Sequence, residues 1–534
     1  MPIRQSYFEL HDIRPLQGAS WIPLRQSINE TIEPPPTEVV RLEAFTGIAT
    51  AAIECAKRPA ADKLGWSELN LDSHRSGVEV WGYRAVDIFR DNHDPFGINL
   101  VIDQYIENTH QYIWYLHPDL VVALRLVAEG DCWFRPDEGW IDVARLKRDA
   151  NGKPELLEMR TEFLADYLSA RDMALFCSSY RERIMVSTRK PVFTWPDDQM
   201  NEVERQDRRE GLITEASYPE SPEHFWTRGC LWRTEWVEPG SSSVRVRGDK
   251  DNHTSSFALG NDGTRLNADR LSGAMAWLYF NATLPSTLLR HRGGRLHWLS
   301  AETGKLGATE FGVHFGVNRI GLVTVFAKDI GNLLPWEQRL WSAHNVTPEG
   351  GVSAELFAAQ MEVNPAETSA PEAELEAAIR DVGEAFSARY GRPLLREHDS
   401  VPDLLRRTHR FRVADNDGLA GLAKDVTRLF IERVDVDAIK NALALGKSEK
   451  LGSVKMVEKL VATRISESDA KEMMAPLFGL YDLRLADAHL GSIDIESGIL
   501  RVGVDKEAAA AIQGWKLLRV FVDTLRAIAA ILPQ

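Results

Sequence analysis

Hydrophobic and polar positions follow different periods in the two parts of this chain. In the first part, short stretches alternate apolar and polar residues, the pattern typical of half-buried strands. Four such stretches are 77–83, 182–188, 230–236 and 311–317. Others, such as 118–127 and 161–171, carry apolar residues at helical spacing. We therefore expect a mixed region in which strands and helices follow one another.

From residue 378 onward, apolar positions recur at helical spacing almost without interruption. We expect helices at 418–433, 452–464 and 466–474, a further helix after a break at Pro476, and a final helix at 505–532. Asp505 is the predicted N-cap of the final helix, and Ser466 followed by Asp469 indicates another helix start. The fold class that follows is α+β, with a mixed N-terminal region and an all-α C-terminal bundle.

The final helix is predicted to have one buried face. Apolar side chains at helical spacing mark this face: Ile512, Trp515, Val522, Leu525, Ala529 and Leu532. Its expected partners are the helix at 418–433 and the helix after Pro476. Together these helices form a compact bundle.

A segment rich in Pro, Ala and acidic residues, 364–377, is predicted to be a linker. It separates an α+β region, 1–363, from a helical connector, 378–417, and a helical domain, 418–534. The polar run 197–211 is a candidate for a further division of the first region. A chain of 534 residues exceeds one ordinary core, so several domains are expected.

The composition indicates a globular protein, with 44% hydrophobic and 26% charged residues. No apolar run is long enough to cross a membrane, and the first residues lack the apolar core of a signal peptide. We therefore expect a cytoplasmic protein. The cysteines lie far apart without a Cys-x-x-Cys pair, which predicts reduced thiols rather than a zinc site or disulfides: Cys55, Cys132, Cys177 and Cys230.

A formal net charge of −15 argues against general coating of nucleic acid, because such affinity comes from neutralising phosphates. Any RNA contact must then be local. One basic cluster surrounds Phe411 and supplies the RNA-binding candidates: Arg406, Arg407, Arg410 and Arg412. A second basic cluster covers 290–298. The alternative for both is an ordinary solvated basic face.

The segment 480–490, Leu-Tyr-Asp-Leu-Arg-Leu-Ala-Asp-Ala-His-Leu, is the strongest candidate for chemistry. On a helix, Arg484 would share a stripe with four apolar or aromatic residues: Leu477, Leu480, Tyr481 and Ala488. An arginine cannot lose its charge, so it needs a carboxylate or a bound anion there. Asp482 and Asp487 are the local carboxylates, and His489 follows on the same helix.

An arginine that holds a phosphate and a histidine that moves a proton near neutral pH would suffice for one reaction. That reaction is metal-free cleavage of RNA through attack by the ribose 2′-hydroxyl. Arg484 and His489 are the two residues in question. Asp487 or Asp482 would orient one of them.

Leu-Tyr-Asp-Leu-Arg-x-x-x-x-His within a helical C-terminal domain resembles the signature of the HEPN superfamily. The resemblance covers about the last quarter of the chain, and it implies a metal-independent endoribonuclease that acts as a homodimer. It also implies Arg484 and His489 as the catalytic pair, with Tyr481 in support, and a role as a toxin or in abortive infection and other antiviral defence. The region 1–363 would then be a sensor or regulator that responds to a phage-derived or protein trigger.

This chain departs from the family pattern at two positions. Leu485 follows the arginine, where members often have Asn or another polar residue. Gly491 stands where members silenced by a nucleotidyltransferase partner carry a tyrosine. The alternative to catalysis is a ligand- or protein-binding protein that uses the bundle only to dimerise, with Arg484 paired to an acid and His489 capping its helix.

Other catalytic motifs are absent from the sequence. There is no His-Glu-x-x-His zinc site, Gly-x-Ser-x-Gly nucleophile elbow or Gly-x-Gly-x-x-Gly dinucleotide loop. Asp137, Asp142 and Glu158 resemble a magnesium nuclease set, but Met159-Arg160 follows instead of x-Lys. We therefore expect no metal and no cofactor.

Overall fold

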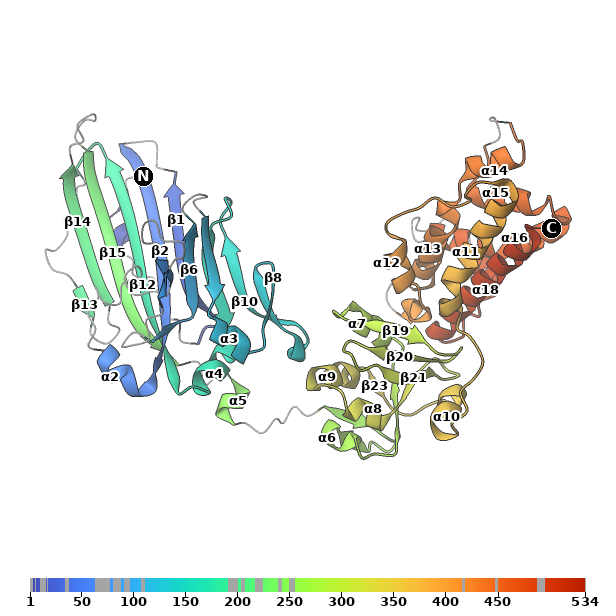
Figure 1. Cartoon of the computed structure of the whole chain (residues 1–534), viewed down its shortest axis with the longest axis horizontal. Coiled ribbons are helices and arrows are strands. Elements are labelled where there is room, and N and C mark those ends of the chain that lie inside the picture. Colours follow the sequence, from blue (N-terminus) through green and yellow to red (C-terminus); the bar gives the residue numbers. More distant parts are fainter. Residues whose placement is uncertain are drawn as a thin grey trace. The chain divides into compact units, whose positions relative to one another are not determined.

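A computed structural model describes residues 3–4, 6–9, 16, 18–33, 38–62, 77–79, 88–90, 97–106, 111–190, 200–202, 207–216, 224–238, 243–248, 255–414, 418–446, 450–486 and 495–533. The chain forms two compact units, Met1–Asn252 and His253–Gln534 (Figure 1). Strands dominate the first unit and the beginning of the second, and helices make up the rest of the second. The predicted α+β class is confirmed.

The first unit is built on a long antiparallel sheet. Its described strands, in order across the sheet, are β13 (Met200–Glu202), β14 (Asp207–Ala216), β15 (His224–Val237), β12 (Met173–Ser187), β2 (Val39–Glu54), β1 (Trp21–Ile32), β11 (Pro154–Arg160), β10 (Ile141–Arg148), β9 (Cys132–Arg135) and β8 (Val127–Glu129), and β5 (Ile98–Asn99) pairs with β2. The predicted stretches 182–188 and 230–236 fall on β12 and β15. β12 pairs with β2 from Met173 opposite Glu54 to Ser187 opposite Val39.

Short helices and a second small sheet complete the first unit. They are α1 (Ser6–Glu9), α2 (Arg58–Ala61), α3 (Pro118–Ala123), α4 (Thr161–Ser169), α5 (Val244–Arg247), the 3₁₀ turns η1 (Cys55–Lys57) and η3 (Pro136–Glu138), and the strands β4 (Ile88–Arg90), β3 (Gly77–Glu79), β6 (Val101–Ile106) and β7 (Gln111–Leu116). The buried face of α4, with Phe163, Leu164 and Tyr167, packs into one core with side chains of β1, β7 and β11. Helical spacing of apolar residues thus positions α4 on the sheet.

The polar run 197–211 does not divide the described part of the first unit. β14 begins at Asp207 and pairs with β15, which in turn pairs with β12. Hydrogen-bonded strands therefore continue across the proposed division, and residues before and after it belong to one compact unit.

The second unit begins with a smaller antiparallel sheet. Its described strands, in order, are β19 (Arg295–Trp298), β20 (Thr303–Gly307), β21 (Val313–Val317), β22 (Val323–Phe326), β18 (Trp277–Phe280) and β23 (Asn345–Val346), with the pair β16 (Ser256–Ala258) and β17 (Arg265–Asn267) beside them. The helices here are α6 (Ala268–Leu271), α7 (Leu284–Arg290), α8 (Ala327–Gly331), α9 (Pro335–Ala343) and α10 (Ala354–Met361). Phe280, Phe315 and Trp341 are fully buried in its core.

The rest of the second unit is helical. Its described elements are α11 (Pro371–Tyr390), α12 (Val401–Arg407), η5 (Arg410–Ala414), α13 (Gly418–Leu429), η6 (Ile431–Arg433), α14 (Val436–Ala442), α15 (Ser453–Val461), α16 (Glu467–Ala486), α17 (Ile495–Val502) and α18 (Ala510–Ile531). α11 lies beside α18, and α16 packs against α13, α17 and α18 (Figure 1). One continuous apolar core joins these helices. Among the described residues, no helix is both long and apolar enough to span a membrane.

Along the sequence, the boundary between the compact units falls between residues 252 and 253. The predicted boundary at 364–377 lies inside the second unit. Phe411 and Ala511, from the helical part, are buried in the core of the small sheet, so the two parts pack as one. The predicted linker also extends too far, because α11 starts at Pro371. Proline suits the first turn of a helix, where its missing N–H is not needed.

Several helix boundaries differ from the predictions, and α13 and α15 end at Leu429 and Val461, earlier than expected. α16 runs through Pro476 without ending, because packing on four other helices, α13, α15, α17 and α18, outweighs the lost hydrogen bond. α18 starts after an N-cap at Ala509, and Asp505 instead accepts a hydrogen bond from the Glu507 amide. The predicted start at Ser466 is confirmed by a bond from the Asp469 amide to Ser466 Oγ.

The buried face of α18 is rotated relative to the prediction. Val522, Leu525 and Leu532 are buried as expected, but Trp515 is only half-buried. Phe521, which is not part of the predicted face, is fully buried. Phe521 packs edge-on against Phe430, the residue that follows α13. The large apolar area of an indole favours burial, which is why the sequence pattern predicts Trp515 in the core.

Candidate functional site

Arg484 lies in the last turn of α16. Its Nη2 is 2.8 Å from Oε1 of Glu432 in η6, and its side chain is 30% exposed. The guanidinium carbon lies 5.5 Å from the ring centre of Tyr481. The arginine therefore has a carboxylate partner, as expected, and Glu432 of η6 provides it.

Arg484 shares one face of α16 with Leu477 and Leu480, which lie seven and four residues before it. Leu477, Leu480 and Leu483 are buried at helical spacing. Arg484 follows Leu483 and is turned by about 100° around the helix. The predicted stripe is therefore confirmed for Leu477 and Leu480, whereas Tyr481 is half-buried and Ala488 lies outside the described residues. The side chain of Arg484 is 30% exposed, so its charge reaches solvent.

Asp482 is engaged by the next helix. Its Oδ2 is 2.7 Å from Nη1 of Arg501 in α17. α17 approaches closely because Gly479 has no side chain: a Cβ there would lie 2.8 Å from the Arg501 Cβ and from the Gly498 carbonyl oxygen. Asp482 therefore helps to dock α17. Asp487 and His489 lie outside the described residues.

Arg410 is buried rather than available to RNA. It is 2% exposed and forms a two-pronged pair with Glu372, from Nε to Oε1 at 2.7 Å and from Nη2 to Oε2 at 2.8 Å. Its Nη1 donates to the Ala301 carbonyl at 2.9 Å, and the guanidinium carbon lies 4.0 Å from the ring centre of Trp298. Its expected role in RNA binding is therefore wrong, and it joins α11 to the small sheet.

The pKa of Glu372 is held below its usual value. Burial alone would raise that pKa, but the charge of Arg410 and its hydrogen bonds more than offset the effect. Both members of the pair, the Glu372 carboxylate and the Arg410 guanidinium, are therefore charged.

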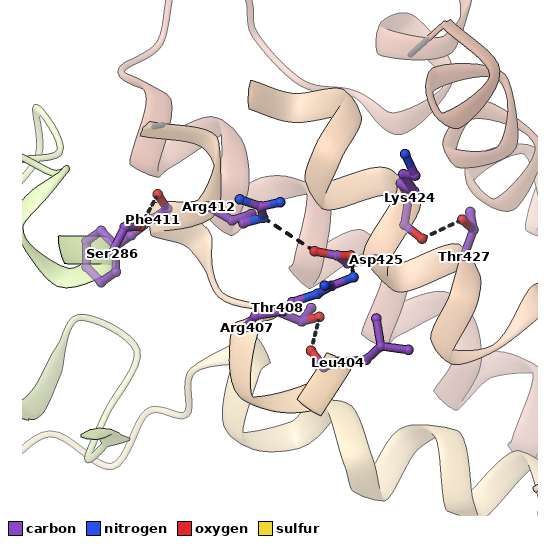
Figure 2. Close-up of polar contacts among 9 residues, drawn as sticks. All are labelled: Ser286, Leu404, Arg407, Thr408, Phe411, Arg412, Lys424, Asp425 and Thr427. Atoms are coloured by element: carbon purple, nitrogen blue, oxygen red, sulfur yellow. Dashed lines mark hydrogen bonds and ion pairs between the residues drawn. The ribbon is translucent and has the colours of Figure 1, made fainter. Parts of the chain in front are cut away.

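A second acid, Asp425 of α13, holds two of the predicted RNA-binding arginines (Figure 2). Its side chain is 2% exposed, with Oδ1 2.5 Å from Arg407 Nη2 and Oδ2 3.4 Å from Arg412 Nε. Arg406 pairs with Asp403 at 2.6 Å on the surface. The basic run is thus tied to acids instead of forming a plain solvated face.

Residues from both basic clusters of the sequence surround a pocket of about 400 Å³. Half of the lining residues are arginines: Ser286, Leu289, Arg290, Asp403, Arg406, Arg407, His409 and Arg412. Arg290 is the last residue of α7, and Arg407 is the last of α12. Arg295 of the second cluster does not line this pocket, and it donates to the Thr309 carbonyl.

Several acids at these sites were not predicted. Asp425 was visible in principle, because it falls between Leu422, Val426 and Leu429 on the apolar face of α13. A carboxylate on such a face requires a cation. Glu372 and Glu432 gave no such signal, because their partners lie far along the chain.

Among the described residues, no group of three or more His, Cys, Asp or Glu side chains is placed to hold a metal ion. None of the cysteines forms a disulfide. No family model matches the chain, and no curated protein or solved structure is detectably similar to it.

Proposed function

We propose that the protein is a metal-independent endoribonuclease whose catalytic groups are Arg484 and His489. The observation that carries the proposal is the place of Arg484. The buried face of α16 anchors the helix, while the arginine in its last turn keeps a side chain that is 30% exposed. A cation fixed in this way can meet a phosphate from solvent with little rearrangement.

The ion pair with Glu432 is compatible with phosphate binding. A guanidinium has five N–H donors, and one carboxylate takes about two of them in a forked pair. In the proposed site, Glu432 fixes the direction of the Arg484 guanidinium, and the remaining donors face the phosphate. A positioned positive group is most effective where negative charge grows in the transition state, on the phosphoryl oxygens.

The proposed reaction needs a proton acceptor and a proton donor. O2′ of the ribose bonds to the adjacent phosphorus while the bond from phosphorus to O5′ of the next nucleotide breaks. His489 acts on the proton that leaves the 2′-hydroxyl or on the one that reaches O5′. The products are a 2′,3′-cyclic phosphate and a 5′-hydroxyl, and DNA is no substrate because it lacks the 2′-hydroxyl.

The test is cleavage of total bacterial RNA, tRNA and a matched DNA in EDTA by wild type, Arg484→Gln and His489→Ala. Arg380→Gln is the control, because Arg380 is an exposed arginine of α11. We expect cyclic phosphate ends from wild type and the control, and a loss of roughly a hundredfold or more in both site variants. No cleavage by wild type, or equal cleavage by all, would refute the proposal.

Glu432→Gln gives a second readout that does not depend on turnover. If Arg484 binds phosphate, removing the competing negative charge should tighten binding of a non-cleavable 2′-deoxy oligonucleotide analogue. Both side chains are about one-third exposed, so stability should change by less than about 1 kcal/mol. Unchanged binding would indicate that the pair is only structural.

One observation favours a second candidate, a non-catalytic binding protein. Arg484 and Asp482 both form ion pairs within their own domain, as expected for a motif used only in packing. In that case His489→Ala would leave partner binding intact, and no RNA would be cleaved by any variant.

By the HEPN resemblance alone, we further propose a homodimer formed through the helical domain, acting as a toxin or in anti-phage defence. The first unit would be its sensor. Light scattering on the purified chain tests the dimer, and a monomer at micromolar concentration would contradict it.

A further inference from the structure

The pocket beside the basic run has the size of a small-molecule site. Its volume is about 400 Å³, and ligand pockets typically measure about 300–1,000 Å³. One wall is the end of α7, with Ser286 and Arg290. The other is α12 and η5, with Arg406 and Arg412. Both walls belong to the second unit.

The charge of the lining points to an anion. Four arginines and one aspartate line the pocket, and the buried Asp425 lies behind it. Of these groups, two positive charges are in excess. Arg290 and Arg407 are the last residues of their helices, where the negative end of the helix dipole stabilises a cation. The arginines can therefore stay close together without a bound anion. An anion in the hollow would still gain from several guanidinium groups at once.

The two walls are held in place before any ligand arrives. Asp425 bonds both Arg407 and Arg412, and so fixes the directions of two guanidinium groups (Figure 2). Ser286 Oγ donates to the Phe411 carbonyl at 3.1 Å, which ties α7 to η5. A site whose donors are fixed in advance loses less entropy on binding.

The donor chemistry selects phosphate. Planar forked N–H groups match phosphate oxygens, and a guanidinium carries five N–H donors in all. The volume suits one nucleotide-sized molecule, and Leu289 adds an apolar patch to the lining. We propose that this pocket binds a small phosphorylated ligand of nucleotide size. The site is separate from Arg484 and does not depend on ribonuclease activity.

The test is calorimetric titration of the full chain with inorganic pyrophosphate and with ADP, in EDTA, with adenosine as the uncharged comparison. Saturable binding of pyrophosphate and ADP, but not adenosine, is expected. Absence of saturable binding at millimolar pyrophosphate and ADP would overturn the proposal.

Variants with opposite expected signs locate the binding. Arg406→Gln and Arg290→Gln should each weaken ADP binding about tenfold, the usual scale for a charge-assisted hydrogen bond. Asp403→Asn removes a negative charge from the lining and should strengthen binding by about threefold, because Asp403 is exposed and partly screened. Arg380→Gln, on the surface of α11, should change nothing.

Two results would refute the location or the ligand class. Equal ADP affinity in wild type, Arg406→Gln and Asp403→Asn would place binding elsewhere. A short single-stranded RNA that binds more tightly than ADP, with the same dependence on Arg406, would make the pocket part of an RNA track. Thermal unfolding of each variant without ligand shows whether the fold is intact, and Arg406, which is 69% exposed, should cost little stability.

Discussion

Replacing Arg410 by methionine should be among the most damaging single changes in the second unit. The variant keeps most of the side-chain volume but leaves Glu372, which is 4% exposed, without its cation. Breaking a buried ion pair from one side costs about 3–5 kcal/mol, because the remaining charge is neither paired nor hydrated. The Ala301 carbonyl also loses a donor, and Trp298 loses its cation.

Differential scanning calorimetry of the full chain is the suitable assay, since two compact units can unfold separately. We expect the transition of the second unit to shift and that of the first to stay. The double variant Arg410→Met/Glu372→Met should recover most of the loss, because replacing both partners by apolar groups is often neutral. Arg380→Gln controls for loss of a surface arginine.

The dependence of stability on pH tests whether the unpaired Glu372 carboxylate causes the loss. The pKa of Glu372 is depressed in the folded wild type, so its contribution is complete above the unfolded carboxyl pKa, about 4.3, and is lost as pH falls through the folded pKa. In Arg410→Met, the amide of residue 410 still donates to Glu372 Oε1, but the positive charge and its forked hydrogen bonds are gone, so burial becomes the dominant effect and raises that pKa. The variant therefore loses stability as pH rises above about 4.3, and its deficit relative to wild type shrinks on acidification.

The reasoning would be refuted by a loss below about 1 kcal/mol in Arg410→Met, since that is the scale of an exposed pair. A double variant as unstable as the single would also refute it, because the damage would then come from packing rather than from the unpaired carboxylate.

Other substitutions test the packing of the helical part. Gly479→Ala should destabilise it by about 1–3 kcal/mol, since the new Cβ would overlap α17. Gly383→Ala in α11, which has space for the methyl, should stabilise it by about 0.4–1 kcal/mol. Phe521→Ala should cost about 3–5 kcal/mol. The half-buried Trp515→Ala should cost clearly less in the same urea titration, and equal losses would contradict the observed face of α18.

Local patterns predicted the element types because strand alternation and helical spacing are properties of neighbouring residues. The helix start at Ser466 was predictable for the same reason, since its cap bonds an amide three residues away. The continuation of α16 through Pro476 was not predictable, because the propensity of proline to end a helix is local, whereas packing on four other helices is not.

The partners of the charged residues were the least predictable part of the site. Arg410 was read as a surface cation from its basic neighbours, but Glu372 and the Ala301 carbonyl bury it. The sequence offers Asp482 and Asp487 as partners for Arg484, but it does not indicate the ion pair with Glu432, which lies about fifty residues earlier. Sequence indicates that a buried charge needs a partner, but only the tertiary fold brings that partner into reach.

The pairing of β12 with β2 constrains how the first unit reaches its native state. β2 is made early in the chain, and its neighbour β12 follows only after β6 to β11 have been synthesised. Contacts so distant in sequence slow folding, because a long loop must close before they form. A nascent chain that ends before Met173 would expose the apolar edge of β2, which is a template for aggregation. Truncations of this unit should therefore keep β12 and β15 or omit β1 and β2 altogether.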